Sequence, residues 1–149
     1  MATVLDVAEY ILRQHGPMTA TKLQKLCYYS QAWHLVWEER PLFADRIEAW
    51  ANGPVSPKLY QRHRLEYMVD HVDGGNPDAL DPAEAESVDV VLQFYGDRSG
   101  AELSELTHRE APWRDARGDT PPGARSTATI TPAAMVEYYE GLLGTSADG

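Results

Sequence analysis

The chain has 149 residues, enough for one domain with a hydrophobic core, and its 43% hydrophobic and 24% charged residues are ordinary values for a soluble globular protein. The 13 Lys and Arg residues against 23 Asp and Glu give a formal charge of -10, which disfavours binding to nucleic acid or to anionic membranes. No stretch has the ~20 apolar residues of a membrane helix, and the single Cys27 excludes an internal disulfide, so we expect a soluble cytoplasmic protein.

The first two predicted helices cover residues 3–15 and 19–38, with Thr3 and Thr19 as caps and a Gly-Pro stop between them. Apolar residues occupy two opposite faces of the second helix, which leaves a narrow polar strip of Gln24, Gln31 and Glu38. This pattern is typical of a helix that other elements cover on both flanks. We therefore expect helix 19–38 to be the central, buried helix of the domain, with the polar strip at its only wet edge.

The following segment lacks helical periodicity, and we expect a short extended piece at Ile47–Trp50 followed by a turn at residues 52–54. A third helix should begin at Pro57 behind the cap Ser56 and continue as far as Val69.

Three further helices are predicted: one capped by Asp81, one over Gly100–His108 capped by Ser99, and one that begins at Pro132. Residues 127–130 form a second extended segment that can pair with the first. The fold class is therefore mainly α: a single compact domain (residues 1–143) of about six helices around the buried helix 19–38, with at most a small two-stranded β element. We expect the tail, residues 144–149, to be disordered.

The sequence carries no familiar catalytic or metal-binding motif. Glu105 and His108 have the ExxH spacing of di-iron bundles, but such a site needs a second pair. Cys27 and His34 share a helical face, yet a catalytic pair needs a third group that orients it. We expect no catalytic residue, no metal and no cofactor. A hydrolase that uses His34 or His108 with a nearby carboxylate remains an alternative.

The aromatic residues are more informative than the titratable ones. Trp and Tyr combine a large apolar body with a polar group, and they frequently anchor protein interfaces. We expect two or three of six such residues to be exposed in a groove, above all those in loops, Trp50 and Trp113. The six are Tyr28, Tyr29, Trp33, Trp37, Trp50 and Trp113.

Several motifs, taken in chain order, resemble the Panacea domain, a family of small antitoxins found in bacterial and phage toxin–antitoxin pairs. The resemblance extends over residues 3–113 and rests on KLQKLCYYSQAWHL, PLF, IEAW, NGPV, YG, ELSELTH and APW. It implies a mostly helical domain that neutralises a toxin by direct protein contact and has no enzyme activity. The family's signature positions correspond here to Lys22, Leu23, Lys25, Leu26, Tyr28, Tyr29, Ala49, Trp50, Gly53, Pro54, Val55, His108, Pro112 and Trp113.

These observations predict an antitoxin whose partner is a cognate protein toxin encoded by the neighbouring gene, without direct contact to nucleic acid or a membrane. The acidic charge can speed the encounter with a basic toxin or imitate phosphates. An alternative is an adaptor that delivers a partner to a cytoplasmic protease, with the tail as a handle. The expected partner-binding residues, around a groove with the central helix as its floor, are Tyr28, Tyr29, His34, Trp50, Asn52, Gly53, Pro54, His108 and Trp113.

Overall fold

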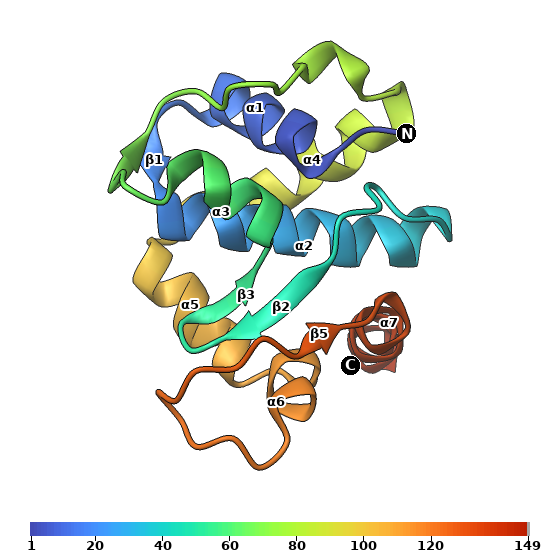
Figure 1. Ribbon diagram of the computed structural model, residues 1–149. Helices are drawn as coiled ribbons and strands as arrows, with labels where there is room; N and C mark the ends of the chain where they lie inside the picture. Colours follow the sequence, from blue (N-terminus) through green and yellow to red (C-terminus); the bar gives the residue numbers. More distant parts are fainter. Residues whose placement is uncertain (149) are drawn as a thin grey trace.

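The long helix α2 (Ala20–Glu38) runs through the middle of the domain (Figure 1). The structure, a computed structural model, describes the backbone of residues 1–148 and the side chains of residues 1–143. This part of the chain forms seven α-helices and a few short strands, so the predicted mainly α fold is confirmed. α2 packs against α1 (Val4–His15), α4 (Pro82–Tyr95), α5 (Gly100–His108) and α7 (Pro132–Asp148).

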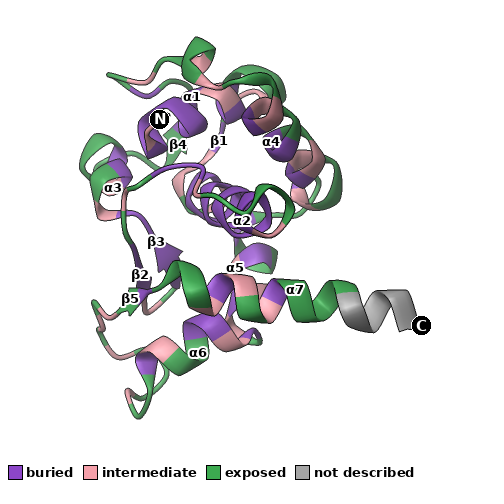
Figure 2. Cartoon of the chain, turned by 90° about the vertical axis from the view of Figure 1, so that its right-hand side faces the viewer, coloured by how far each residue is buried: buried purple, intermediate pink, exposed green. Residues whose placement is uncertain are grey.

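The middle of α2 is covered on every side. All residues from Leu23 to Leu35 are buried, and Figure 2 shows the helix enclosed by its neighbours. α2 begins after the predicted cap, Thr19, whose hydroxyl accepts a hydrogen bond from the backbone amide of Lys22 (3.2 Å). The prediction of a central, buried helix is therefore confirmed.

The prediction of a wet edge on this helix is wrong for two of its three residues, because Gln24 and Gln31 are buried. The Gln24 amide group donates to the carbonyl of Ser56 (3.2 Å) and accepts from its N–H (2.9 Å). Gln31 donates to the carbonyl of Phe43 (2.7 Å) and accepts from the N–H of Leu42 (2.8 Å). Each glutamine thus satisfies backbone groups of a neighbouring loop, which explains why a polar side chain is stable inside the core.

The β structure is more extensive than the predicted two-stranded element. A three-stranded antiparallel sheet has the order β3 (Gly53–Val55), β2 (Ile47–Trp50), β5 (Thr129–Ile130), with Glu48 opposite Val55 and Ile47 opposite Ile130. The expected pairing of the two extended segments is therefore confirmed. A separate two-stranded sheet joins β1 (Met18–Thr19) to β4 (Met68–Val69).

Helix α3 (Pro57–His63) is shorter than predicted. It begins behind Ser56, whose hydroxyl accepts from the amide of Leu59 (3.2 Å), as expected for a cap. It ends at His63 and not at Val69, because Met68 and Val69 pair with the strand that precedes α2. Strand pairing has overridden the helical spacing of the sequence here.

The second half of the chain is helical where caps were predicted. Asp81 and Ser99 each form a capping box with the glutamate three residues later. A short helix, α6 (Ala111–Arg117), and the 3-10 turn η1 (Pro77–Ala79) were not predicted from the sequence.

The prediction of a disordered tail concerns residues 144–149. Their side chains, and Gly149 as a whole, lie outside the described part of the structure, so the disorder stays a prediction. None of the helices that the structure describes is both long and apolar enough to cross a membrane.

Candidate functional site

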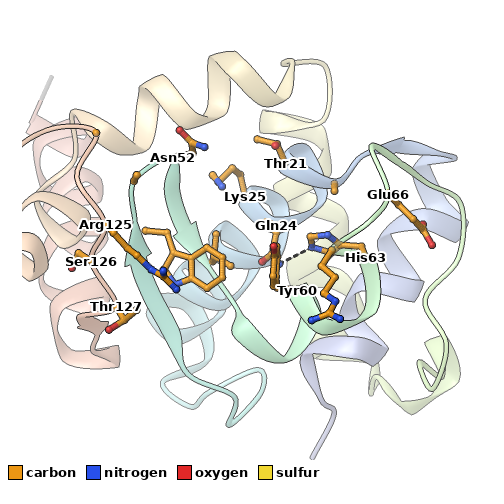
Figure 3. Close-up of a pocket in the computed structure, with 16 residues that line it drawn as sticks. Thr21, Gln24, Lys25, Asn52, Tyr60, His63, Glu66, Arg125, Ser126 and Thr127 are labelled. Carbon is orange, nitrogen blue, oxygen red and sulfur yellow. Dashed lines mark hydrogen bonds between the residues drawn. The ribbon is translucent and has the colours of Figure 1, made fainter.

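A recess of about 520 Å³ opens at the N-terminal end of α2 (Figure 3). Its walls come from the first two turns of α2, the β2–β3 hairpin, α3 with the residues that follow it, and loop residues 123–127. The recess, which we call the first recess, therefore lies where segments far apart in the sequence meet. Its lining includes Thr21, Lys25, Trp50, Asn52, Tyr60 and Arg125.

The hairpin contributes Trp50 and Asn52 to this recess. Trp50 is half-buried: its Nε1 donates to a carboxylate oxygen of Glu48 (2.8 Å), and its ring meets Tyr60 edge-on with the centroids 5.0 Å apart. Asn52 is exposed at the turn. The indole is thus held by a hydrogen bond and a ring contact while one side of it remains open to the recess.

Trp113 is buried beneath the hairpin, so the expectation that it is exposed in a groove is wrong. It is 7% exposed, and its Nε1 donates to the backbone carbonyl of Trp50 (2.8 Å). The ring of His108 stacks on it with the centroids 4.1 Å apart. Trp113 therefore fixes the position of the hairpin in which Trp50 and Asn52 lie.

Arg117 joins the hairpin to the long loop after α6. Its guanidinium lies 4.8 Å from the centroid of the Trp113 ring and donates to the carbonyl of Ala49 (3.0 Å). It also donates to the carbonyls of Pro121 (3.0 Å) and Ala124 (2.6 Å). One buried side chain therefore closes the loop whose later residues form a wall of the first recess.

Lys25 lies at the inner end of the first recess and is 1% exposed. Burial lowers its pKa to about 7. Its side chain passes Gly53, which has a φ of 121°, and a Cβ atom at that glycine would lie 2.6 Å from Lys25 Cε and 2.9 Å from Thr107 Oγ1. Both the backbone angle and the close approach of Lys25 therefore require glycine at this position.

A second recess of about 590 Å³ lies on the other side of Thr21 and Asn52, which line both. Two polar atoms in its lining, Ser104 Oγ and His108 Nε2, are buried without a hydrogen-bond partner among the described residues. The pKa of His108 is lowered, first by burial and then by the nearby charge of Lys25. Its imidazole therefore favours the neutral form.

The residues after α3, which we call the 64–68 segment, expose large apolar side chains between the two recesses. Leu65 is 92% exposed, Tyr67 79% and Met68 52%. Arg64 and Glu66 line the first recess, whereas Tyr67 lines the second. The sequence does not predict this cluster, because the spacing of its residues continues the pattern of helix α3.

Five of the predicted partner-binding residues come together here. Trp50 and Asn52 line the first recess, His108 lines the second, and Gly53 and Trp113 lie buried beneath the hairpin. Pro54 is buried in β3.

The predicted role of the other three residues in a groove is wrong, because Tyr28, Tyr29 and His34 lie in the core, 1%, 0% and 0% exposed. Tyr29 Oη donates to a carboxylate oxygen of Glu110 (2.7 Å), which also accepts from Tyr139 Oη (2.8 Å). The Tyr28 and Tyr139 hydroxyls are 3.0 Å apart. These polar groups satisfy one another inside the domain and have no surface to offer a partner.

Neither of the two histidines of the hydrolase alternative forms a hydrogen bond to a carboxylate among the described residues. His34 Nδ1 lies 2.7 Å from Ser87 Oγ in the core, and burial lowers the pKa of this imidazole. His108 stacks on Trp113 and lines the second recess. No group of three or more His, Cys, Asp or Glu side chains in the described part of the chain is arranged to hold a metal ion.

Comparison with known proteins agrees with the resemblance seen in the sequence. The chain is 29% identical over 110 residues to Antitoxin SocA of Caulobacter vibrioides (strain NA1000 / CB15N), an alignment that covers 65% of this chain and 58% of the relative. The chain therefore spans little more than half the length of this curated relative. No solved structure matches the chain. Residues 23–114, more than half of the sequence, match the family described as Antitoxin SocA-like, Panacea domain, and the chain belongs to that family.

Proposed function

We propose that this protein is an antitoxin that neutralises a protein toxin, encoded by the neighbouring gene, by binding it directly. Membership of the family supports the antitoxin role. The contact surface that we propose, the hairpin face, consists of Trp50, Asn52, Leu65, Tyr67 and Met68. It includes the openings of both recesses.

The exposed apolar residues of the 64–68 segment carry this proposal. Large apolar side chains that stay in water next to a hollow are characteristic of protein interaction sites, because a partner can remove them from solvent. Leu65 and Tyr67 are largely exposed; Tyr67 lines the second recess, and the residues on either side of Leu65, Arg64 and Glu66, line the first. Trp50 and Tyr67 add aromatic groups of the kind that most often dominate binding energy.

The interaction can be tested by removing the apolar groups of the hairpin face. We expect the double variant Leu65→Ser, Tyr67→Ser to lose neutralisation when it is co-expressed with the product of the neighbouring gene, and to lose co-purification with it. The reason is that both side chains lose most of the apolar area that the toxin would cover. Because both residues are exposed, the variant should keep the melting temperature of the wild type.

The matched control is Phe94→Ser, which removes a 71% exposed aromatic residue on α4 that lines neither recess. This variant should still neutralise and co-purify. Equal activity of the double variant and the wild type would refute the hairpin face as the contact surface. A neighbouring product that is harmless alone, or that stays toxic beside the wild-type protein, would refute the antitoxin proposal itself.

A further inference from the structure

Lys25 differs from the other two lysines of the chain in having no partner. Lys22 Nζ donates to the carbonyl of Gly96 (2.6 Å), and Lys58 Nζ lies 3.4 Å from a carboxylate oxygen of Asp45. Lys25 is the most buried of the three, yet its ammonium group forms neither a hydrogen bond nor an ion pair with any residue that the structure describes. A donor of three hydrogen bonds therefore has no partner within the protein, in a residue that is 1% exposed and lines the first recess.

Such an arrangement is costly for the free domain. An ammonium taken out of water loses its hydration, and a buried charge is normally repaid by an opposite charge or by hydrogen bonds. The surrounding structure nevertheless brings this amine to the recess: Gly53 leaves room for the Lys25 stem, where any Cβ atom would collide with it. The desolvation cost of the Lys25 ammonium, and the room that Gly53 leaves for its stem, together indicate an amine that is positioned to bind a ligand.

The setting of the amine favours an anion. In Figure 3 the Lys25 side chain extends into the space between Thr21 and Asn52, two neutral residues able to donate hydrogen bonds. Arg64 and Arg125 are exposed residues of the same lining, and Glu66 is the one acidic side chain in it. The first recess is thus locally basic in a chain with a formal charge of -10.

A carboxylate suits this recess better than a phosphate. Phosphate sites commonly combine several cations or a cluster of backbone N–H groups at a helix N-terminus. Here a single ammonium lies at depth, in the second turn of α2, while both arginines are at the exposed rim. One compact point charge matches the single charge of an Asp or Glu side chain.

We propose that the first recess receives an Asp or Glu side chain of the bound toxin, and that Lys25 Nζ forms the ion pair with its carboxylate. This inference rests on the proposed direct binding of a toxin. The proposed ion pair adds a chemical requirement to toxin binding: the toxin must present an acidic side chain to the hairpin face, at the centre of the contact.

Proton uptake should accompany binding. Burial lowers the pKa of Lys25 to about 7, and a carboxylate beside the amine would raise it again by favouring the charged form. The other titratable or charged groups that line the first recess are Tyr60, His63, Arg64, Glu66 and Arg125, and His108 of the second recess lies near the amine. Burial lowers the pKa of both histidines, which favours the neutral form of each. Toxin affinity should therefore decrease as the pH rises above about 7, through loss of the Lys25 charge.

The test compares Lys25→Met with Lys58→Met, an equivalent change at an exposed lysine outside the recess. Methionine keeps the length of the Lys25 stem and removes the buried charge, so this variant should fold with at least the stability of the wild type. We expect Lys25→Met to bind the co-purified toxin about tenfold or more weakly below pH 7, and to lose the pH dependence of the wild type. Lys58→Met should keep both the affinity and its pH dependence.

The pKa of Lys25 itself supplies a readout that needs no variant. The ¹³Cε resonance of Lys25, followed by NMR in the free protein and in the toxin complex, should report a raised pKa in the complex. In the free protein, added acetate should likewise raise the pKa of Lys25. A larger effect of inorganic phosphate than of acetate would overturn the proposal in favour of a phosphate site.

The outcomes separate this inference from the function on which it rests. If the wild type binds the toxin and Lys25→Met binds equally well with the same pH profile, the ion pair is refuted and the antitoxin role stands. If Lys25→Met weakens binding while the pKa of Lys25 stays unchanged in the wild-type complex, the residue has a structural role only and the inference is also refuted. Absence of toxin binding by the wild type would refute the proposed function.

Discussion

Glu110 shows how a single residue joins three helices. It is the residue before α6, and one of its carboxylate oxygens accepts hydrogen bonds from Tyr29 of α2 and Tyr139 of α7. Burial raises the pKa of this carboxyl, although the two tyrosine hydrogen bonds oppose that effect. The same network explains why two tyrosines that resembled partner-binding residues in the sequence are unavailable to a partner.

The raised pKa of Glu110 predicts a pH dependence of stability. Because the folded state holds this proton more tightly than the unfolded state, the stabilisation is complete below the unfolded pKa near 4.5 and is lost as the pH rises through the folded pKa. The wild type should therefore lose stability relative to Glu110→Gln as the pH rises above 4.5. Urea unfolding of both proteins over this range measures the difference, and Glu105→Gln, an exposed glutamate, controls for the change in net charge. Parallel curves for the wild type and Glu110→Gln would contradict the prediction.

At the scale of elements, most helix starts and the pairing of β2 with β5 followed from the sequence, whereas the pairing of β1 with β4 did not. Thr3, Asp81 and Ser99 were identifiable as caps because a capping box is formed by residues three positions apart. The end of α3 was not, because it depends on pairing between Met68 and Thr19, which lie far apart in the chain. A helix cap depends on residues that are close in the sequence, whereas this strand pairing joins residues that come together only when the chain folds.

The candidate site divides in the same way. Turn chemistry and family resemblance identified Trp50 and Asn52, which do line the first recess. The family resemblance marks Lys25 only as a signature position, since no sequence pattern reveals that its ammonium group will lie at the inner end of a recess without a partner. The exposure of Leu65 and Tyr67 depends on the early end of α3 and was equally hidden.

The buried Gln31 of α2 gives a prediction for the loop between α2 and β2. Gln31→Leu keeps a similar volume but leaves the amide of Leu42 and the carbonyl of Phe43 buried without their partner. We expect it to destabilise the domain by about 3 kcal/mol, because each abandoned backbone group costs its desolvation. Urea unfolding measures this loss. Gln93→Leu on the exposed side of α4 is the matched control, and an equally small effect of both changes would show that the loop does not depend on Gln31.

The whole molecule carries a strong negative charge around a locally basic recess. A formal charge of -10 acts over roughly 30 Å in dilute salt and would steer a basic partner toward the surface, whereas the recess acts only on contact. In the proposed complex, long-range attraction and short-range recognition would therefore have opposite signs.

This division predicts a kinetic signature of toxin binding. The association rate constant should fall severalfold as the ionic strength rises toward physiological values, because salt screens the overall field. The dissociation rate constant should change much less, since buried contacts are poorly screened. Stopped-flow or surface-plasmon measurements at several salt concentrations separate the two constants. An association rate that does not respond to salt would show that the acidic charge has no part in the encounter.

The guanidinium of Arg117 closes the loop after α6 through the carbonyls of Pro121 and Ala124, and this loop continues into the wall of the first recess. A loop closed at one buried point tolerates changes in length, since each added residue costs little closure entropy. Insertions between residues 124 and 128 would reshape the recess wall without altering any side chain packed on α2. Descendants of this chain thus have a route to new partners in which the fold is conserved and a single loop supplies the variation.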